Sequence, residues 1–215
     1  MKHILSSCRL ALGRYTWRHN QVLKVFYKAA EEQTMKLQYN PQPKAARGEI
    51  EFIPEGMPPP YREEERVKRQ DSGEGYGQWV VSADLKGSEE KFPVPTSQRP
   101  DLIIWEDELK LVHILELTVP HEDNIGAAHE RKQRRYEGLV AELEATGWKV
   151  DYFPVEVGCR GYVGTSVRRW LSKAGLGPRK ASTLVRELQE TAQQASHWIW
   201  NKREDNTWQE DTVLV

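Results

Sequence analysis

The sequence is poor in cysteine and has no long apolar run. Only Cys8 and Cys159 are cysteines among its 215 residues. Two cysteines exclude a disulfide framework and a zinc finger built from four cysteines, and they suit a reducing compartment. A membrane-spanning helix needs about 20 consecutive apolar residues, but the apolar runs here are short, and Leu111–Leu115 contains His113. We therefore expect no membrane span, and the charged residues within positions 1–13 argue against a secretory signal.

The chain also lacks an excess of charge of either sign. Its formal net charge of -1 by itself argues against a nucleic-acid partner. However, acidic residues concentrate in 49–75, 116–130 and 204–211, whereas 159–180 contains six basic residues and no acidic one. Clustered arginine and lysine are typical of phosphate contacts. The near-zero sum therefore conceals a polarised distribution that is compatible with DNA binding.

The chain divides into regions that differ in their content of apolar residues, proline, glycine and charge. Residues 14–35 are expected to form a helix that packs on the core, and residues 36–77 a linker rich in proline, glycine and charge. Residues 78–200 are expected to form the core, and residues 201–215 a polar tail. Such a linker is typical of segments that bury little apolar surface.

Apolar periodicity and turn residues predict the secondary structure. Helices are expected at 14–33, with Thr16 as the N-cap, and at 127–145, 166–174 and 178–200; strands are expected at 79–85, 101–106, 109–119 and 149–157, with a short extra strand at 49–53. The turn at 106–108 predicts a hairpin, and the next helix joins two strands. This order predicts a mixed α/β fold, with a central mixed sheet of about four strands flanked by helices.

Two carboxylates are expected to meet at one end of this sheet. Asp101 opens one strand of the predicted hairpin and Glu116 lies near the end of the other. Carboxylates gathered in this way suit Mg²⁺ or Mn²⁺, and Asp84, which ends the first core strand, is a further acidic candidate. Lys132 lies one helical turn before Tyr136 on the apolar stripe, so we expect it to point toward the sheet. A structural salt bridge or an exposed strand end would explain the same residues.

The residues around this constellation resemble a known family. Arg99-Pro100-Asp101, then Glu116-Leu-Thr-Val-Pro120, then the stretch from Ala128 to Tyr136, resemble the PD-(D/E)xK nuclease superfamily. More narrowly, they resemble the restriction-like endonuclease of site-specific non-LTR retrotransposon polyproteins, in which the lysine comes from the helix after the strand. Thr118 accordingly occupies the strand position here.

The resemblance implies a restriction-endonuclease-like core and assigns roles within it. Asp101 and Glu116 would bind Mg²⁺ or Mn²⁺, Lys132 would position water or phosphate, and Tyr136 would support Lys132 or contact DNA. Residues 1–13 are similar to the second half of the zinc knuckle that precedes this nuclease, with His3 and Cys8 as its remaining ligands. Two ligands cannot complete a tetrahedral site, so no stable zinc is expected. In the family a reverse transcriptase lies upstream, a module that this sequence does not include.

The expected function is Mg²⁺-dependent hydrolysis of a phosphodiester bond in DNA, in a nuclear protein because of that substrate. The expected DNA contacts are Arg99, His129, Arg131, Arg135, Arg160, Arg168, Arg169 and Lys173. A relict or domesticated DNA-binding module of the same fold, without catalysis, is the alternative, and a purely structural or protein-binding domain is the third interpretation. Trp170, Trp198 and Trp200 are expected in helix packing rather than in base stacking.

Overall fold

The fold is a four-stranded mixed sheet with helices on both faces. The computed structural model describes residues 2–39, 78–85, 92–93 and 96–205. The strand order is β1-β2-β3-β4, with β1 and β2, and β2 and β3, antiparallel and β3 and β4 parallel. Most of the expected linker, including its extra strand at 49–53, lies outside the described residues. The predicted mixed α/β class and the sheet of about four strands are confirmed.

An acidic residue stabilises the turn of the hairpin formed by β2 (Leu102–Glu106) and β3 (Leu111–Thr118). The carboxylate of Glu106 is buried and accepts hydrogen bonds from the main-chain N–H groups of Glu108, at 2.9 Å, and Leu109, at 2.6 Å. Lys110 completes the turn with a φ of 51°. The buried acid is therefore satisfied by the turn itself. β1 (Val80–Ala83) extends the hairpin on the β2 side.

The helix between β3 and β4 covers one face of the sheet. α3 (Ile125–Ala145) follows the short η2 (Glu122–Asn124) and leads into β4 (Lys149–Glu156). Its buried residues Tyr136, Leu139 and Leu143 pack against Val112 and Ile114 of β3. Because β3 and β4 are parallel, the connection must cross the sheet, and the amphipathic helix predicted there is what makes the crossing.

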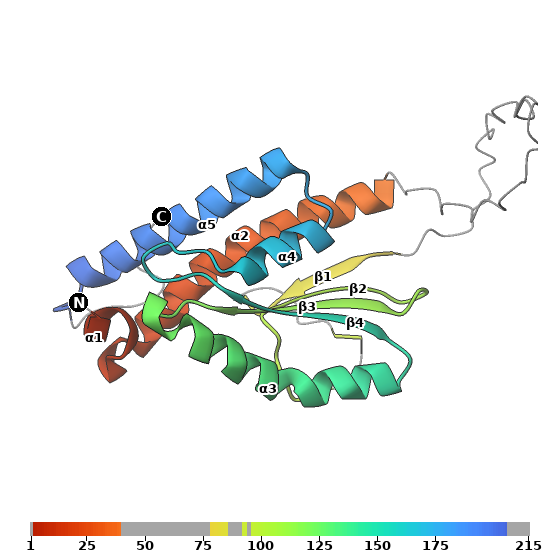
Figure 1. Ribbon diagram of the computed structural model, residues 1–215, viewed down its shortest axis with the longest axis horizontal. Helices are drawn as coiled ribbons and strands as arrows, with labels where there is room; N and C mark the ends of the chain where they lie inside the picture. The colour runs from red at the N-terminus through yellow and green to blue at the C-terminus, as the bar shows by residue number, and fades with distance from the viewer. Residues whose placement is uncertain (1, 40–77, 86–91, 94–95, 206–215) are drawn as a thin grey trace, which may run out of the picture.

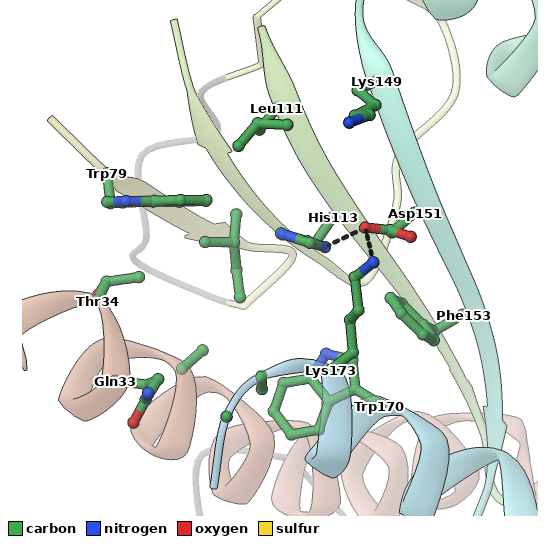
Figure 2. A pocket seen from close by; sticks show the side chains of 14 residues that line it. Gln33, Thr34, Trp79, Leu111, His113, Lys149, Asp151, Phe153, Trp170 and Lys173 are labelled. Carbon is green, nitrogen blue, oxygen red and sulfur yellow. Dashed lines mark ion pairs between the residues drawn. The ribbon is translucent and has the colours of Figure 1, made fainter. Parts of the chain in front are cut away.

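The other face carries the remaining long helices. α2 (Leu12–Tyr39), α4 (Thr165–Lys173) and α5 (Pro178–Asn201) lie together on this side, as Figure 1 shows. At the end of the sheet where β3 and β4 begin, a cavity of about 460 Å³ remains between the sheet, α2 and α4. His113 faces Trp79 there, while Asp151 pairs with His113 and with Lys173 (Figure 2).

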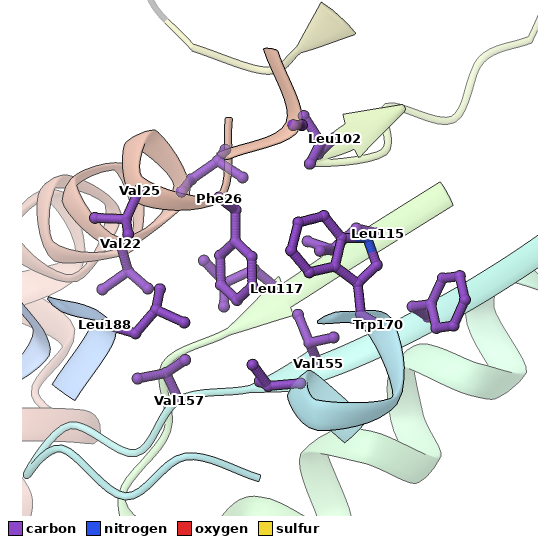
Figure 3. Packing of buried hydrophobic residues seen from close by; sticks show 14 of the residues in the cluster. Val22, Val25, Phe26, Leu102, Leu115, Leu117, Val155, Val157, Trp170 and Leu188 are labelled. Atoms are coloured by element: carbon purple, nitrogen blue, oxygen red, sulfur yellow. The ribbon is translucent and has the colours of Figure 1, made fainter. Parts of the chain in front are cut away.

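The main core fills the rest of this second face. Phe26 of α2 and Trp170 of α4 meet edge to face, with ring centroids 5.3 Å apart, over Leu115 of β3 (Figure 3). Trp170 is 2% exposed. Trp198 of α5 packs on Trp17, with centroids 4.9 Å apart. Trp170 and Trp198 therefore serve helix packing, as expected.

The start of the first long helix differs from the prediction. α2 begins at Leu12, after α1 (Lys2–Ser6) and η1 (Arg9–Ala11). Thr16 is not an N-cap, because it lies inside the helix and its hydroxyl donates to the Leu12 carbonyl at 3.2 Å. A threonine hydroxyl can satisfy itself on the preceding turn as well as at a cap, so its position alone was ambiguous. Within the described residues, no helix is long and apolar enough to cross a membrane.

Candidate active site

The strand register brings Asp101 and Glu116 together. Leu102 pairs with Leu115 across the β2–β3 ladder, so Asp101, just before β2, lies opposite Glu116. The Asp101 N–H donates to Glu116 Oε2 at 3.2 Å, and the Leu117 N–H donates to Asp101 Oδ2 at 2.6 Å. The two residues are 8% and 2% exposed. Two buried carboxylates at one sheet end are costly in free energy unless a cation or hydrogen bonds compensate them.

Lys132 supplies that compensation from α3. Its ammonium donates to Glu116 Oε1, and its side chain is 16% exposed, so it lies between the sheet and the surface. Burial raises the pKa of Glu116 and the charge of Asp101 raises it further, whereas Lys132 lowers it. The structure thus brings Asp101, Glu116 and Lys132 into one cluster.

Two stacked tyrosines hold the helix turn that carries Lys132. The Tyr136 hydroxyl donates to the Arg99 carbonyl and the Tyr152 hydroxyl to the Lys132 carbonyl, each at 2.9 Å, and the ring centroids are 5.6 Å apart. Burial, followed by the charge of Glu116, raises the pKa of Tyr136. Because Tyr136 is 1% exposed, its ring packs inside the fold, and its hydroxyl holds the main chain at Arg99.

His19 belongs to the same cluster, and the sequence analysis did not identify it as a site residue. Its Nε2 lies 3.3 Å from Asp101 Oδ2 and 3.3 Å from the Leu117 carbonyl oxygen. Burial lowers the pKa of His19, but the hydrogen bond and charge of Asp101 outweigh this, so the pKa is raised overall. The available signal was the polar run from Arg18 to Asn20 on a helix whose neighbouring residues are buried.

A polar cleft of about 570 Å³ opens onto this cluster, between α2, the end of β3 and the start of α3. Asp84 lines it beside Asp101, whose carbonyl accepts the Asp84 N–H at 3.0 Å. Arg131 and Lys132 of α3 line it as well. The cleft is therefore lined by both acidic and basic side chains, an arrangement suited to a metal-bridged phosphate.

The donor set of this cluster fits a hard divalent cation. Asp101 and Glu116 offer carboxylate oxygens, and the buried hydroxyl of Thr118 has no hydrogen-bond partner among the described residues. No three histidine, cysteine, aspartate or glutamate side chains are gathered as a metal site in the described part of the chain. Mg²⁺ does not require such a cage, because it commonly binds one or two carboxylates and completes its shell with water and substrate phosphate.

The other predicted DNA contacts are dispersed. His129 Nδ1 lies 2.8 Å from Glu156 Oε1, Arg160 pairs with Glu122 at 3.0 Å, and Lys173 pairs with Asp151 at 3.1 Å beside the distant cavity. Arg168 and Arg169 are exposed on α4, and Arg135 lies over the Tyr136 ring at 5.8 Å. Arg131 lines the cleft itself, and Arg99 directly precedes Pro100 and Asp101 in the chain. The eight residues therefore do not form a single patch around the cleft.

The predicted knuckle remnant lies against α2. Tyr15 accepts the Cys8 N–H at 3.0 Å and donates to the Ile4 carbonyl at 2.7 Å. His3 is exposed and Cys8 is half-buried. These main-chain bonds hold the segment in place without involving either predicted ligand side chain.

The comparisons with known proteins add no family to this picture. A scan against protein-family models and a search of curated proteins both find no match to the sequence. What the chain does must therefore be argued from the residues of the cleft.

Proposed function

We propose that this chain is a metal-dependent DNA endonuclease domain of the restriction-like type found in non-LTR retrotransposons. The main observation behind the proposal is that Lys132, from the helix after the strand, donates to the carboxylate of Glu116. Glu116 in turn lies opposite Asp101 in the sheet. Asp101 and Lys132 of this acid, acid and lysine set line a polar cleft that contains further basic groups. The same three residues carry the sequence resemblance, and the mixed sheet with an antiparallel hairpin followed by a helix and a parallel strand is compatible with a restriction-endonuclease-like core.

Each residue of the cluster has a task in phosphodiester hydrolysis. A water oxygen bonds to phosphorus, the bond from phosphorus to the leaving sugar oxygen breaks, and protons pass from the water and to the leaving oxygen through solvent. A divalent ion bound by Asp101 and Glu116 supplies charge neutralisation and an acidified water. Lys132 orients the attacking water or neutralises a phosphate oxygen, and such a preorganised donor is worth about 10²–10³ in rate. Tyr136 and Tyr152 fix the helix turn that carries this lysine.

The basic groups support DNA as the substrate. Arg131 lies beside Lys132 on the cleft wall, and the exposed Arg168 and Arg169 offer contacts away from it. Phosphate contacts of this kind give binding that weakens as salt rises. A DNA substrate would place the protein in the nucleus.

Nicking of supercoiled plasmid tests the proposal. The full chain should nick plasmid in Mg²⁺ or Mn²⁺, and Asp101→Asn and Lys132→Met should each reduce the rate by about 100-fold or more. Asp107→Asn is the matched control, because Asp107 is exposed in the turn at the far end of β2, and it should nick like wild type. Equal nicking by wild type and Asp101→Asn would overturn the proposal.

Binding measurements separate the alternatives. Duplex binding that weakens between low and moderate salt, with no nicking in either metal, would identify a DNA-binding module without catalysis. No salt-dependent binding at all would favour a structural or protein-binding domain.

A further inference from the structure

We propose that His19 is a ligand of the catalytic metal, so that the site contains an imidazole nitrogen as well as carboxylate oxygens. The inference rests on the proposed function and goes beyond the acid, acid and lysine set. Its ligands would be His19 Nε2, Asp101 Oδ2 and the Leu117 carbonyl oxygen, with Glu116 beside them. These groups come from α2, from the residue before β2 and from β3, so only the folded chain assembles them.

Two oxygen atoms lie around His19 Nε2 at separations that suit neighbouring ligands of one cation. Nε2 lies 3.3 Å from Asp101 Oδ2 and 3.3 Å from the Leu117 carbonyl oxygen. Adjacent ligands of an ion coordinated at about 2.1–2.2 Å lie about 3 Å apart, so a small movement of each group would complete the shell.

The second ring nitrogen has a partner that suits this role. His19 Nδ1 lies 3.3 Å from the side-chain oxygen of Asn20. An amide oxygen at that position favours the tautomer with hydrogen on Nδ1, which leaves the Nε2 lone pair free for a metal. Asn20 is therefore a positioning residue for His19.

The neighbouring arginine fixes the helix that presents this imidazole. Arg18 is 2% exposed and donates to the Val119 carbonyl at 2.9 Å and to Ser196 Oγ at 3.0 Å. These bonds tie α2 to the end of β3 and to α5. The His19 side chain remains 23% exposed and lines the cleft. It is thus held rigidly and is still reachable by an ion from solvent.

An imidazole ligand changes which metal the site prefers. Mg²⁺ favours oxygen donors, whereas first-row transition ions such as Mn²⁺ accept nitrogen readily. The wild-type chain should therefore bind Mn²⁺ more tightly than Mg²⁺. His19→Gln should weaken Mn²⁺ binding by about tenfold or more and bring the two affinities closer together.

Electron paramagnetic resonance of Mn²⁺ tests the assignment without any DNA or turnover. The full wild-type chain, loaded with Mn²⁺, should show ¹⁴N coupling from a directly bound imidazole in electron spin-echo modulation. The coupling should disappear in His19→Gln and persist in His121→Gln, the matched control, because His121 lines the same cleft but pairs with Asp123. The wild-type spectrum alone shows whether an imidazole binds the metal, so the test remains decisive even where a variant fails to fold.

The outcomes distinguish this inference from the proposed function. One outcome is that Mn²⁺ binds the wild-type chain without ¹⁴N coupling and no longer binds Asp101→Asn. That result would overturn the His19 assignment but not the proposed nuclease site. Equal loss of the coupling in His121→Gln would also overturn the assignment. No Mn²⁺ binding by wild type would overturn both proposals.

Discussion

Removing the lysine or neutralising the glutamate of the buried pair should change the free energy of unfolding by very different amounts. Lys132→Met takes away the ammonium and leaves the Glu116 carboxylate buried beside Asp101. Glu116→Gln removes the carboxylate charge instead and leaves Lys132, which is 16% exposed and can turn toward solvent. The two substitutions break the same ion pair, but only the first strands a buried charge.

The size of the asymmetry follows from the burial of the two partners. Stranding one charge of a buried pair costs about 3–5 kcal/mol. The Glu116 carboxylate keeps the hydrogen bond from the Asp101 N–H, so we expect Lys132→Met to cost about 3 kcal/mol, near the lower end. For a chain of this length, that lowers Tm by about 6–12 °C. Glu116→Gln removes repulsion with Asp101 and should leave the free energy of unfolding within about 1 kcal/mol of wild type.

The difference should also depend on pH. Because burial raises the pKa of Glu116 in the folded state, the folded chain binds its proton more tightly than the unfolded chain does. This carboxyl therefore contributes stability below its unfolded pKa, and the contribution is lost as pH rises through the folded value. Loss of Lys132 raises the folded pKa further. The cost of Lys132→Met should thus be small in acid and grow toward neutral pH.

Urea unfolding in the presence of a chelator measures these free energies without metal. Wild type, Lys132→Met, Glu116→Gln and the double variant should be compared at about pH 5 and pH 7, with the double variant close to Glu116→Gln. A loss in Glu116→Gln as large as that in Lys132→Met would refute the reasoning, as would a cost of Lys132→Met that does not change with pH.

Three further predictions concern other contacts. Burial lowers the pKa of His113 and Asp151 partly restores it, so Asp151→Asn should lower it further in an NMR titration; a rise would contradict this. Trp170→Ala should cost about 3–5 kcal/mol of unfolding free energy by urea denaturation, because the ring is 2% exposed; a cost below about 1 kcal/mol would contradict the packing. The buried hydroxyl of Thr118, on the Glu116 face of β3, has no hydrogen-bond partner among the residues that the structure describes. Thr118→Lys in the Lys132→Met background should therefore recover about tenfold of the lost nicking rate; no recovery would show that the lysine must come from the helix.

The local order of the chain was largely predictable. Turn residues and apolar alternation predicted the β2–β3 hairpin and placed Asp101 opposite Glu116, and helical periodicity indicated that Lys132 faces the sheet. Each of these inferences uses residues close in sequence, or the fixed geometry of one ladder or one helix. The partners of the basic residues were not predictable in this way, because Arg160 with Glu122 and Lys173 with Asp151 join separate elements.

The contribution of α2 to the cleft shows where the limit lies. The Arg18-His19-Asn20 run interrupts a helix that is otherwise buried at Trp17 and Val22. Polar groups in such a position cost free energy unless they find partners, so the sequence implies that partners exist without identifying them. Val119, the main-chain partner of Arg18, lies 101 residues away, and His19 contacts Leu117 across 98 residues. No periodicity spans such distances. The run itself predicts a buried polar contact, and the packing of α2 on the sheet is what turns that contact into part of the candidate active site.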